Sequence, residues 1–233
     1  MTTFVCVHGA FRGGWAFGPV RRHLQRAGHD LFTPSLTGMG DRSHLRPADL
    51  GLSTWVTDVV SLIEQHDLRD VMLVGHSQGG LVITAASQQC HERLAGLVFL
   101  DAPEPLDGQR GVDLGPPVPM GVEAPPLPPR GTWLPPTPLT AESGLSNELV
   151  DWINERLCAT PLAPSLDPVV MGDAAGAIER HRLVASQTPA GYPSAVTRQR
   201  HDREGVAYEV IDAPHDLIVS HPEAVANWLA DLT

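Results

Sequence analysis

LVGHSQGG, the stretch from Leu73 to Gly80, begins within the apolar run Val71–Val74 and places Ser77 shortly after that run. Glycines stand two residues before and two residues after Ser77. One interpretation is a tight turn between a strand and a helix, in which the serine is a small polar filler. The other is a nucleophile elbow, the G-x-S-x-G turn that exposes a serine hydroxyl above a sheet. The choice depends on whether a base and an acid elsewhere in the chain can reach Ser77.

Short apolar segments alternate with segments of helical periodicity along most of the chain. This alternation predicts an α/β fold, with a mostly parallel sheet of about six strands and helices on both faces. Ser220 and Glu223 have the spacing of a capping box at the start of the last helix. The expected strands are Val5–Val7, Leu31–Thr33, Val71–Val74, Leu97–Leu100, Leu183–Ala185 and Tyr208–Ile211. The expected helices are Phe17–Ala27, Thr54–Gln65, Gly80–His91, Asn147–Leu157, Ala195–Arg203 and Pro222–Leu232.

Proline dominates the segment between Pro103 and Pro138, which contains 12 of the chain's 22 prolines. Because proline fixes φ and lacks an amide proton, this segment is excluded from central strands and helix interiors. A disordered insert, a polyproline motif for a partner and an irregular covering over a pocket all fit this composition. Apolar residues between Leu134 and Ile153 favour the covering. We therefore predict a core of residues 1–102 and 176–233, with a proline-rich cap of residues 103–175.

A serine becomes a nucleophile only when a base lies within hydrogen-bond reach. Of the eleven histidines, His215 is the best placed, because it lies just beyond the expected strand Tyr208–Ile211. The carboxyl ends of parallel strands share one edge of a sheet, so this loop and the turn at Ser77 can meet. We predict that His215 is the base.

The third member of such a site is an acid that orients the histidine. Asp101 directly follows the expected strand Leu97–Leu100, again at the carboxyl edge. It fits the chain order of serine, acid and histidine that accompanies a nucleophile elbow. The alternative role for Asp101 is a carboxylate that caps its own loop. Glu104 and Asp216 are weaker candidates for the acid. Asp216 is adjacent to His215, and the side chain of an adjacent residue seldom reaches its neighbour's ring.

Acyl transfer also needs backbone amides that stabilise an oxyanion. The glycine-rich stretch from Val7 to Trp15 follows the first strand, and the amide of Ala10 within it, with that of Gln78, is predicted to supply these donors. The stretch matches neither common phosphate-loop pattern. Aromatic residues are candidates for lining an acyl or alcohol pocket, with simple packing as the alternative; they are Phe11, Trp15, Trp133 and Trp152.

The composition limits the partners. A formal net charge of −11 disfavours nucleic acid, and all 16 basic residues are arginines, which excludes a lysine Schiff base. Three cysteines without a C-x-x-C pair predict free thiols and a cytoplasmic location. No export signal or membrane-spanning run is apparent, so no membrane partner is expected. No histidine-carboxylate cluster has metal-ligand spacing, so we expect no metal and no organic cofactor. The expected partner is a small-molecule substrate, and a homo-oligomer stays open.

Five motifs together resemble the α/β-hydrolase superfamily. They are VHGAFRGGW at 7–15, LTGMGDRSHL at 36–45, LVGHSQGG at 73–80, LVFLDAPEPLDG at 97–108 and APHDLIVSHPEAVANWL at 213–229. Within the superfamily the chain is similar to the small bacterial and plant esterases related to hydroxynitrile lyases. The likeness spans about residues 3–108 and 178–232, and the proline-rich middle resembles a cap only in general character.

The resemblance implies an α/β-hydrolase fold with Ser77 as nucleophile, His215 as base, and the Ala10 and Gln78 amides as oxyanion donors. Many members of the superfamily carry the acid after the penultimate strand, where this chain has Ser186-Gln187-Thr188. Haloalkane dehalogenases and some lipases carry it after the strand that follows the nucleophile, which corresponds to Asp101. Hydroxynitrile lyases have a lysine beside the catalytic histidine, and Asp216 at that place disfavours cyanohydrin cleavage.

These observations predict a serine hydrolase that cleaves a carboxylic ester or thioester of a small, largely apolar molecule through an acyl-enzyme. One alternative is a non-hydrolytic lyase or cyclase of secondary metabolism that uses the same three residues. Another is a ligand-binding receptor built on a hydrolase scaffold. The fold alone does not distinguish the substrate.

Overall fold

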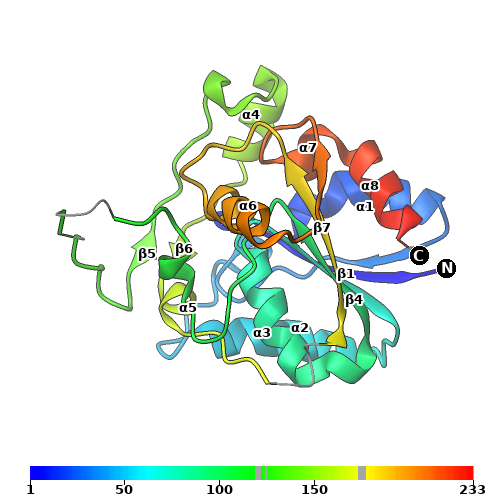
Figure 1. Cartoon of the computed structure of the whole chain (residues 1–233), viewed down its shortest axis with the longest axis horizontal. Helices are drawn as coiled ribbons and strands as arrows, with labels where there is room; N and C mark the ends of the chain where they lie inside the picture. The colour runs from blue at the N-terminus through cyan, green and yellow to red at the C-terminus, as the bar shows by residue number, and fades with distance from the viewer. Residues whose placement is uncertain (119–121, 124, 173–176, 233) are drawn as a thin grey trace.

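A parallel six-stranded sheet forms the centre of the computed structural model (Figure 1). The structure describes residues 1–118, 122–123, 125–172 and 177–232. The strand order is β2-β1-β3-β4-β7-β8, and every neighbouring pair is parallel. The predicted α/β architecture is therefore confirmed. The strands are β1 Thr3–Val7, β2 Asp30–Phe32, β3 Val71–His76, β4 Leu94–Leu100, β7 Glu179–Ala185 and β8 Glu209–Ile211.

Helices cover both faces of the sheet, as predicted. Along β1, Phe4 and Cys6 belong to the core on one face, whereas Val5 and Val7 belong to the core on the other. Because the strand is buried on both sides, its sequence is a continuous apolar run. No helix within the described residues is both long enough and apolar enough to cross a bilayer. The first face packs against α1 (Gly18–Arg26), α7 (Leu217–Ser220) and α8 (Pro222–Asp231), and the second against α2 (Leu52–Gln65) and α3 (Gly79–Cys90).

The chain leaves the sheet after β4 and returns to it at β7. In Figure 1 the intervening segment lies to one side of the sheet, and part of its proline-rich stretch extends away from it. The predicted boundary between residues 175 and 176 lies outside the described residues. The elements of this segment are an antiparallel pair of β5 (Trp133–Leu134) and β6 (Thr160–Pro161), with α4 (Asn147–Asn154) and α5 (Ala163–Leu166). Helix α6 (Pro193–Glu204) then connects β7 to β8.

The elements that the sequence did not predict are short. They are β5, β6, α5, α7 and the 3-10 helices at Gly14–Phe17, Gly40–Arg42, His91–Arg93, Gly111–Asp113 and Ala141–Ser143. The predicted capping box is wrong, because α7 ends at Ser220 and His221 is the N-cap residue of α8, without a capping hydrogen bond from its side chain. The Ser220 hydroxyl instead donates to the Asp216 carbonyl at 3.2 Å.

Candidate active site

Ser77 lies on the tight turn between β3 and α3. Its φ is +51°, a left-handed conformation that is uncommon for a residue with a side chain. Close backbone contacts explain the two flanking glycines. A Cβ on Gly75 would lie 2.7 Å from the Gly79 carbonyl, and a Cβ on Gly79 would lie 2.4 Å from the carbonyl oxygen of Val7. The glycine spacing in LVGHSQGG therefore follows from how tightly this turn packs on itself and on β1.

Three non-glycine residues with positive φ lie beyond the carboxyl ends of neighbouring strands. Phe11 follows β1 with a φ of +62°, Ser77 follows β3, and Asp101 follows β4 with a φ of +41°. Such conformations cost free energy and persist where the surrounding structure imposes them, which often happens at functional sites. The strand order also changes direction between β1 and β3, the usual place for a ligand in an α/β sheet.

Ser77, His215 and Asp101 form one hydrogen-bonded line at this edge. The Ser77 hydroxyl lies 3.0 Å from His215 Nε2, and His215 Nδ1 lies 2.5 Å from Asp101 Oδ2. An ionised carboxylate only accepts hydrogen bonds, so the histidine carries its proton on Nδ1. His215 Nε2 is then free to accept the hydrogen bond that the Ser77 hydroxyl donates.

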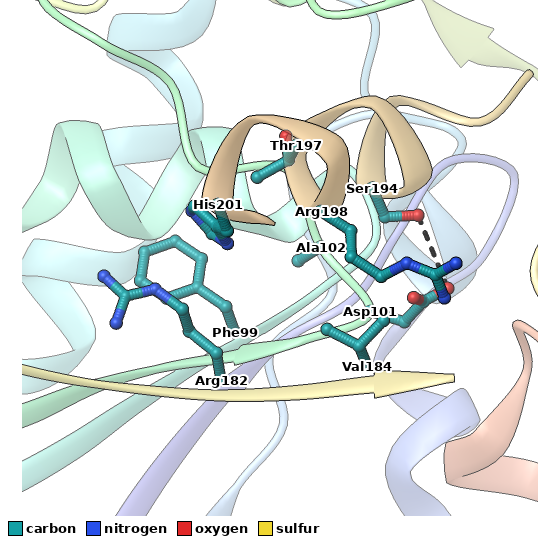
Figure 2. Close-up of a pocket in the computed structure, with 9 residues that line it drawn as sticks. All are labelled: Phe99, Asp101, Ala102, Arg182, Val184, Ser194, Thr197, Arg198 and His201. Atoms are coloured by element: carbon teal, nitrogen blue, oxygen red, sulfur yellow. Dashed lines mark hydrogen bonds between the residues drawn. The ribbon is translucent and has the colours of Figure 1, made fainter. Parts of the chain in front are cut away.

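The Asp101 carboxylate is only 1% exposed, and both of its oxygens accept hydrogen bonds. Oδ2 also accepts from Thr188 Oγ1 at 2.5 Å and from Ser194 Oγ at 3.4 Å, while Oδ1 accepts from the Ala185 amide at 3.2 Å. Figure 2 shows Ser194, on α6, turned toward Asp101. Burial raises the pKa of Asp101, but the hydrogen bonds from His215 and Thr188 outweigh burial and leave the pKa below its ordinary value. Asp101 is therefore ionised at neutral pH.

Glu104, a weaker candidate for the acid, is held away from His215 by an ionic cluster. It accepts from Arg180 at 2.6 Å and from Arg182 at 2.7 Å, and His201 Nε2 lies 3.4 Å away. Arg200 donates to the Glu104 carbonyl at 2.7 Å. Burial raises the pKa of Glu104, but His201 and Arg182 outweigh it and keep the pKa well below its ordinary range. This carboxylate ties the segment after β4 to β7 and α6.

Asp216, the other weaker candidate, lies beside His215 in sequence but forms an ion pair with Arg12 at 2.8 Å. Burial raises the pKa of Asp216, and the neighbouring Arg12 charge outweighs burial and lowers it. Both members of the pair are buried.

The predicted oxyanion donors lie on two loops next to Ser77. Among the described residues, the backbone amides of Ala10 and Gln78 donate to no backbone or side-chain acceptor. The amide of Phe11 differs, because it donates to Thr160 Oγ1 at 2.6 Å and is therefore occupied. The Gln78 side chain donates to Ser165 Oγ at 2.8 Å, which connects the elbow to α5.

Two buried histidines support the same loops in their neutral form. His8 Nδ1 donates to the Gly9 carbonyl at 2.9 Å, and His8 Nε2 accepts from the Leu36 amide at 3.1 Å. His76 Nε2 donates to the His215 carbonyl at 2.9 Å. Burial lowers the pKa of both His8 and His76 to about 4.

We expect the folded protein to lose stability as the pH falls from about 6.5 to about 4. In that window the unfolded chain binds protons on His8 and His76 that the folded chain does not bind, since their folded pKa values are near 4. Each histidine contributes up to about 3 kcal/mol to this loss. Urea unfolding at several pH values measures it. His8→Asn should flatten the pH dependence and the exposed His44→Asn should not; equal slopes in all three proteins would contradict the expectation.

A cavity of about 570 Å³ adjoins Ser77, His215 and the two free amides. This volume is within the range usual for small-molecule sites. The wall is largely apolar, and the segment between β4 and β7 supplies much of it. The apolar side chains of the wall include Phe11, Leu81, Val112, Leu114, Leu134, Leu139 and Leu162.

Aromatic residues only partly follow the sequence prediction. Phe11 lines the cavity, whereas Trp15, Trp133 and Trp152 are not among its lining residues. Trp15 and Trp152 pack edge to face with ring centroids 5.1 Å apart, so simple packing explains them. Tyr192, which the sequence did not single out, lies edge-on against the His215 ring at 4.8 Å and lines the cavity.

Known proteins resemble this chain over most of its length. The model of the alpha/beta hydrolase family matches residues 4–228. The carbendazim hydrolyzing esterase of Nocardioides sp. (strain SG-4G) is 31% identical over 243 residues, and the match covers 100% of both chains. A pyrethroid hydrolase of Sphingobium wenxiniae is 32% identical over 105 residues, which is 44% of this chain and 36% of the relative.

Solved structures show the same fold at lower identity. A methylesterase from Arabidopsis superposes with a TM-score of 0.79 and 22% identity, covering 100% of this chain and 98% of its own. The superfamily resemblance that the five sequence motifs indicate is thus confirmed. Since the family model spans nearly the whole chain and one relative aligns from end to end, the chain belongs to the alpha/beta hydrolase family.

Proposed function

We propose that this enzyme is a serine esterase that cleaves a carboxylic ester or thioester of a small, largely apolar molecule through an acyl-enzyme. The observation that carries the proposal is the hydrogen-bonded line of Ser77, His215 and Asp101 beside a largely apolar cavity. Family membership and the full-length likeness to a protein named as an esterase support ester hydrolysis.

In the first half of the reaction, the Ser77 oxygen attacks the ester carbonyl carbon and its proton moves to His215 Nε2. The carbonyl oxygen takes the electron pair, and the amides of Ala10 and Gln78 stabilise its negative charge. When the carbonyl re-forms, the bond to the alcohol oxygen breaks and this oxygen takes the proton from His215. Asp101 orients the imidazole and stabilises its positive charge while the proton resides there.

The second half releases the acyl group. His215 Nε2 takes a proton from a water molecule as the water oxygen attacks the acyl carbon, and the same two amides stabilise the second oxyanion. Collapse breaks the bond to the Ser77 oxygen, which recovers the proton from His215. The products are a carboxylic acid and the alcohol or thiol, and the enzyme returns to its starting state.

We also propose that residues 103–175 act as the cap of this site. The cavity wall includes Val112 and Leu114 near the start of this segment and Leu134, Leu139 and Leu162 further on. The Ser165 hydroxyl on α5 accepts the hydrogen bond from the Gln78 side chain and so joins the segment to the elbow. These contacts support a segment that shapes the acyl and alcohol pockets.

A chain-length series of p-nitrophenyl esters tests the proposal. We expect purified enzyme to hydrolyse acetate to about octanoate esters, with falling kcat/KM for palmitate, because a cavity of this size accommodates small ligands and not long chains. Release of p-nitrophenol measures the rates, and a fluorophosphonate probe should label Ser77 in the same preparation.

Two outcomes would contradict the proposed esterase function. If no ester of the series is hydrolysed while the probe still labels Ser77, the competent serine serves another reaction, such as a lyase or cyclase step. If neither hydrolysis nor labelling occurs, the receptor alternative is favoured.

A further inference from the structure

Arg12 and Asp216 make a bidentate ion pair in the wall of the cavity. Arg12 Nε and Nη2 donate to Asp216 Oδ1 at 3.0 and 2.8 Å, and Nη2 also donates to Oδ2 at 2.8 Å. The two side chains are only 9% and 7% exposed. Planar guanidinium-carboxylate contacts of this kind are among the stronger hydrogen bonds in proteins, so the pair is a fixed part of the wall.

The pair lies beside the reacting groups. Arg12 stands two residues after Ala10 on the loop that follows β1, and Asp216 directly follows His215 on the loop after β8. Both residues line the cavity together with Ser77. A substrate whose carbonyl lies between the Ala10 amide and Ser77 therefore has the pair as a near neighbour.

The pair also decides the net charge of the wall. Apart from Arg12 and Asp216, no described arginine, aspartate or glutamate lines this cavity. Their opposite charges cancel. Either charge alone, partly removed from water, would act strongly on a charged substrate: an unpaired arginine would attract an anion, and an unpaired aspartate would attract a cation and repel an anion.

One nitrogen of the Arg12 guanidinium is not used by Asp216. The contacts with Asp216 use Nε and Nη2, and Nη1 makes no hydrogen bond to the described residues. Because the carboxylate already neutralises the guanidinium, Nη1 can donate to an uncharged oxygen or nitrogen acceptor without drawing a carboxylate into the cavity.

We propose that the Arg12–Asp216 pair determines the charge specificity of the site, so that the enzyme selects uncharged esters and rejects carboxylate-bearing ones. This inference rests on the proposed esterase function. Arg12 and Asp216 are specificity-determining residues in this proposal and take no part in the proton transfers.

Asp216→Asn tests the proposal most directly, because it keeps the shape of the side chain and unpairs the Arg12 charge. The substrates are p-nitrophenyl 5-methylhexanoate and mono-p-nitrophenyl glutarate, which has a carboxylate in place of the terminal isopropyl group. A second pair, phenyl butyrate and 4-carboxyphenyl butyrate, carries the charge on the leaving group. We expect wild type to prefer the uncharged member of each pair, and Asp216→Asn to raise the charged-to-uncharged ratio of kcat/KM at least about tenfold in one of them.

Three further variants separate specificity from stability. Arg12→Gln leaves Asp216 unpaired, so it should lower the ratio for anionic esters and favour p-nitrophenyl 4-(trimethylammonio)butyrate. The double variant Arg12→Met/Asp216→Leu removes both charges and should keep the preference for uncharged esters. Glu92→Gln removes one exposed negative charge at the opposite edge of the sheet, next to the start of β4, and should leave all ratios unchanged. If Asp216→Asn does not fold, Arg12→Gln still decides the question, because it also leaves one charge of the pair without its partner.

The outcomes for the two proposals differ. If wild type hydrolyses neither uncharged ester, the proposed esterase function is wrong. If wild type hydrolyses the uncharged esters and the folded single variants keep the wild-type charge ratios, the esterase function stands and the charge-specificity proposal is overturned. Equal use of charged and uncharged esters by wild type would also overturn it.

Discussion

Ser77→Ala is expected to lower kcat for p-nitrophenyl esters by roughly 10⁵- to 10⁶-fold. Alanine removes the oxygen that would form the acyl-enzyme, and no other described hydroxyl lies within hydrogen-bond distance of His215 Nε2. Any residual rate should come from the cavity and the amides of Ala10 and Gln78, which still bind the ester and stabilise an oxyanion. Stopped-flow and steady-state measurements of p-nitrophenol release give the loss in kcat.

The control for this variant is Ser186→Ala. Ser186 lies just after β7, at the same edge of the sheet, but its hydroxyl donates to Asp212 and takes no part in the line at His215. We expect Ser186→Ala to keep wild-type kcat and to be labelled by a fluorophosphonate, and Ser77→Ala to lose both properties. Retention of more than a tenth of the activity by folded Ser77→Ala would exclude a covalent role for this serine.

Asp101→Asn is expected to lower kcat by roughly 10⁴-fold. The amide preserves the size of the side chain, and asparagine tolerates the positive φ that the backbone has at this position. The charge that favours the proton on His215 Nδ1 is lost, however, so the imidazole would adopt the wrong tautomer or orientation for accepting the Ser77 proton. Thermal unfolding of the variant distinguishes this effect from loss of the fold.

Glu104→Gln provides the comparison, because Glu104 is the neighbouring buried carboxylate on the same segment. The substitution leaves Arg180 and Arg182 without their negatively charged partner and should cost about 3 kcal/mol of unfolding free energy. The folded fraction should retain kcat, since Glu104 does not contact His215. A large loss of kcat in Glu104→Gln with little loss in Asp101→Asn would reverse the assignment of the acid.

Most of the sheet could be predicted from the sequence because its strands are buried on both faces. Runs such as Val71–Val74 and Leu97–Leu100 have no alternating polar positions, and the helix α2 before the first of them has a clear apolar face. The ends of the strands and helices were less predictable. The β3 strand extends to His76, and α7 separates β8 from α8, so that Ser220 is in a helix and not at an N-cap. A four-residue helix has too few positions for a periodic pattern.

The candidate site was predictable where a residue directly follows a strand. Ser77 and Asp101 follow β3 and β4, and His215 follows β8 by a few residues, so strand positions alone bring them to one edge. Thr188 and Tyr192 could not be found in this way. Their contacts with Asp101 and His215 depend on how the loop after β7 folds against α6, which no local pattern encodes.

The sequence also does not predict the Arg12–Asp216 pair, because its two residues come together only when distant loops pack against each other. The two residues are more than two hundred positions apart and lie on loops after β1 and β8. In the sequence, Asp216 stands out only as a neighbour of His215, and Arg12 only as part of a glycine-rich stretch. The volume and lining of the cavity are likewise properties of packed loops, so the sequence could not distinguish Phe11, which lines the cavity, from the three tryptophans, which are not among its lining residues.

The ionic cluster at Glu104 has a consequence for protein engineering. Glu104 lies four residues beyond the end of β4, and Arg180 and Arg182 belong to β7, the neighbouring strand at which the chain returns. Ion pairs at the two ends of the proposed cap therefore hold those ends together. A segment transplanted from a relative between residues 105 and 178 would keep these ion pairs, so its two ends would meet the scaffold at a preset spacing.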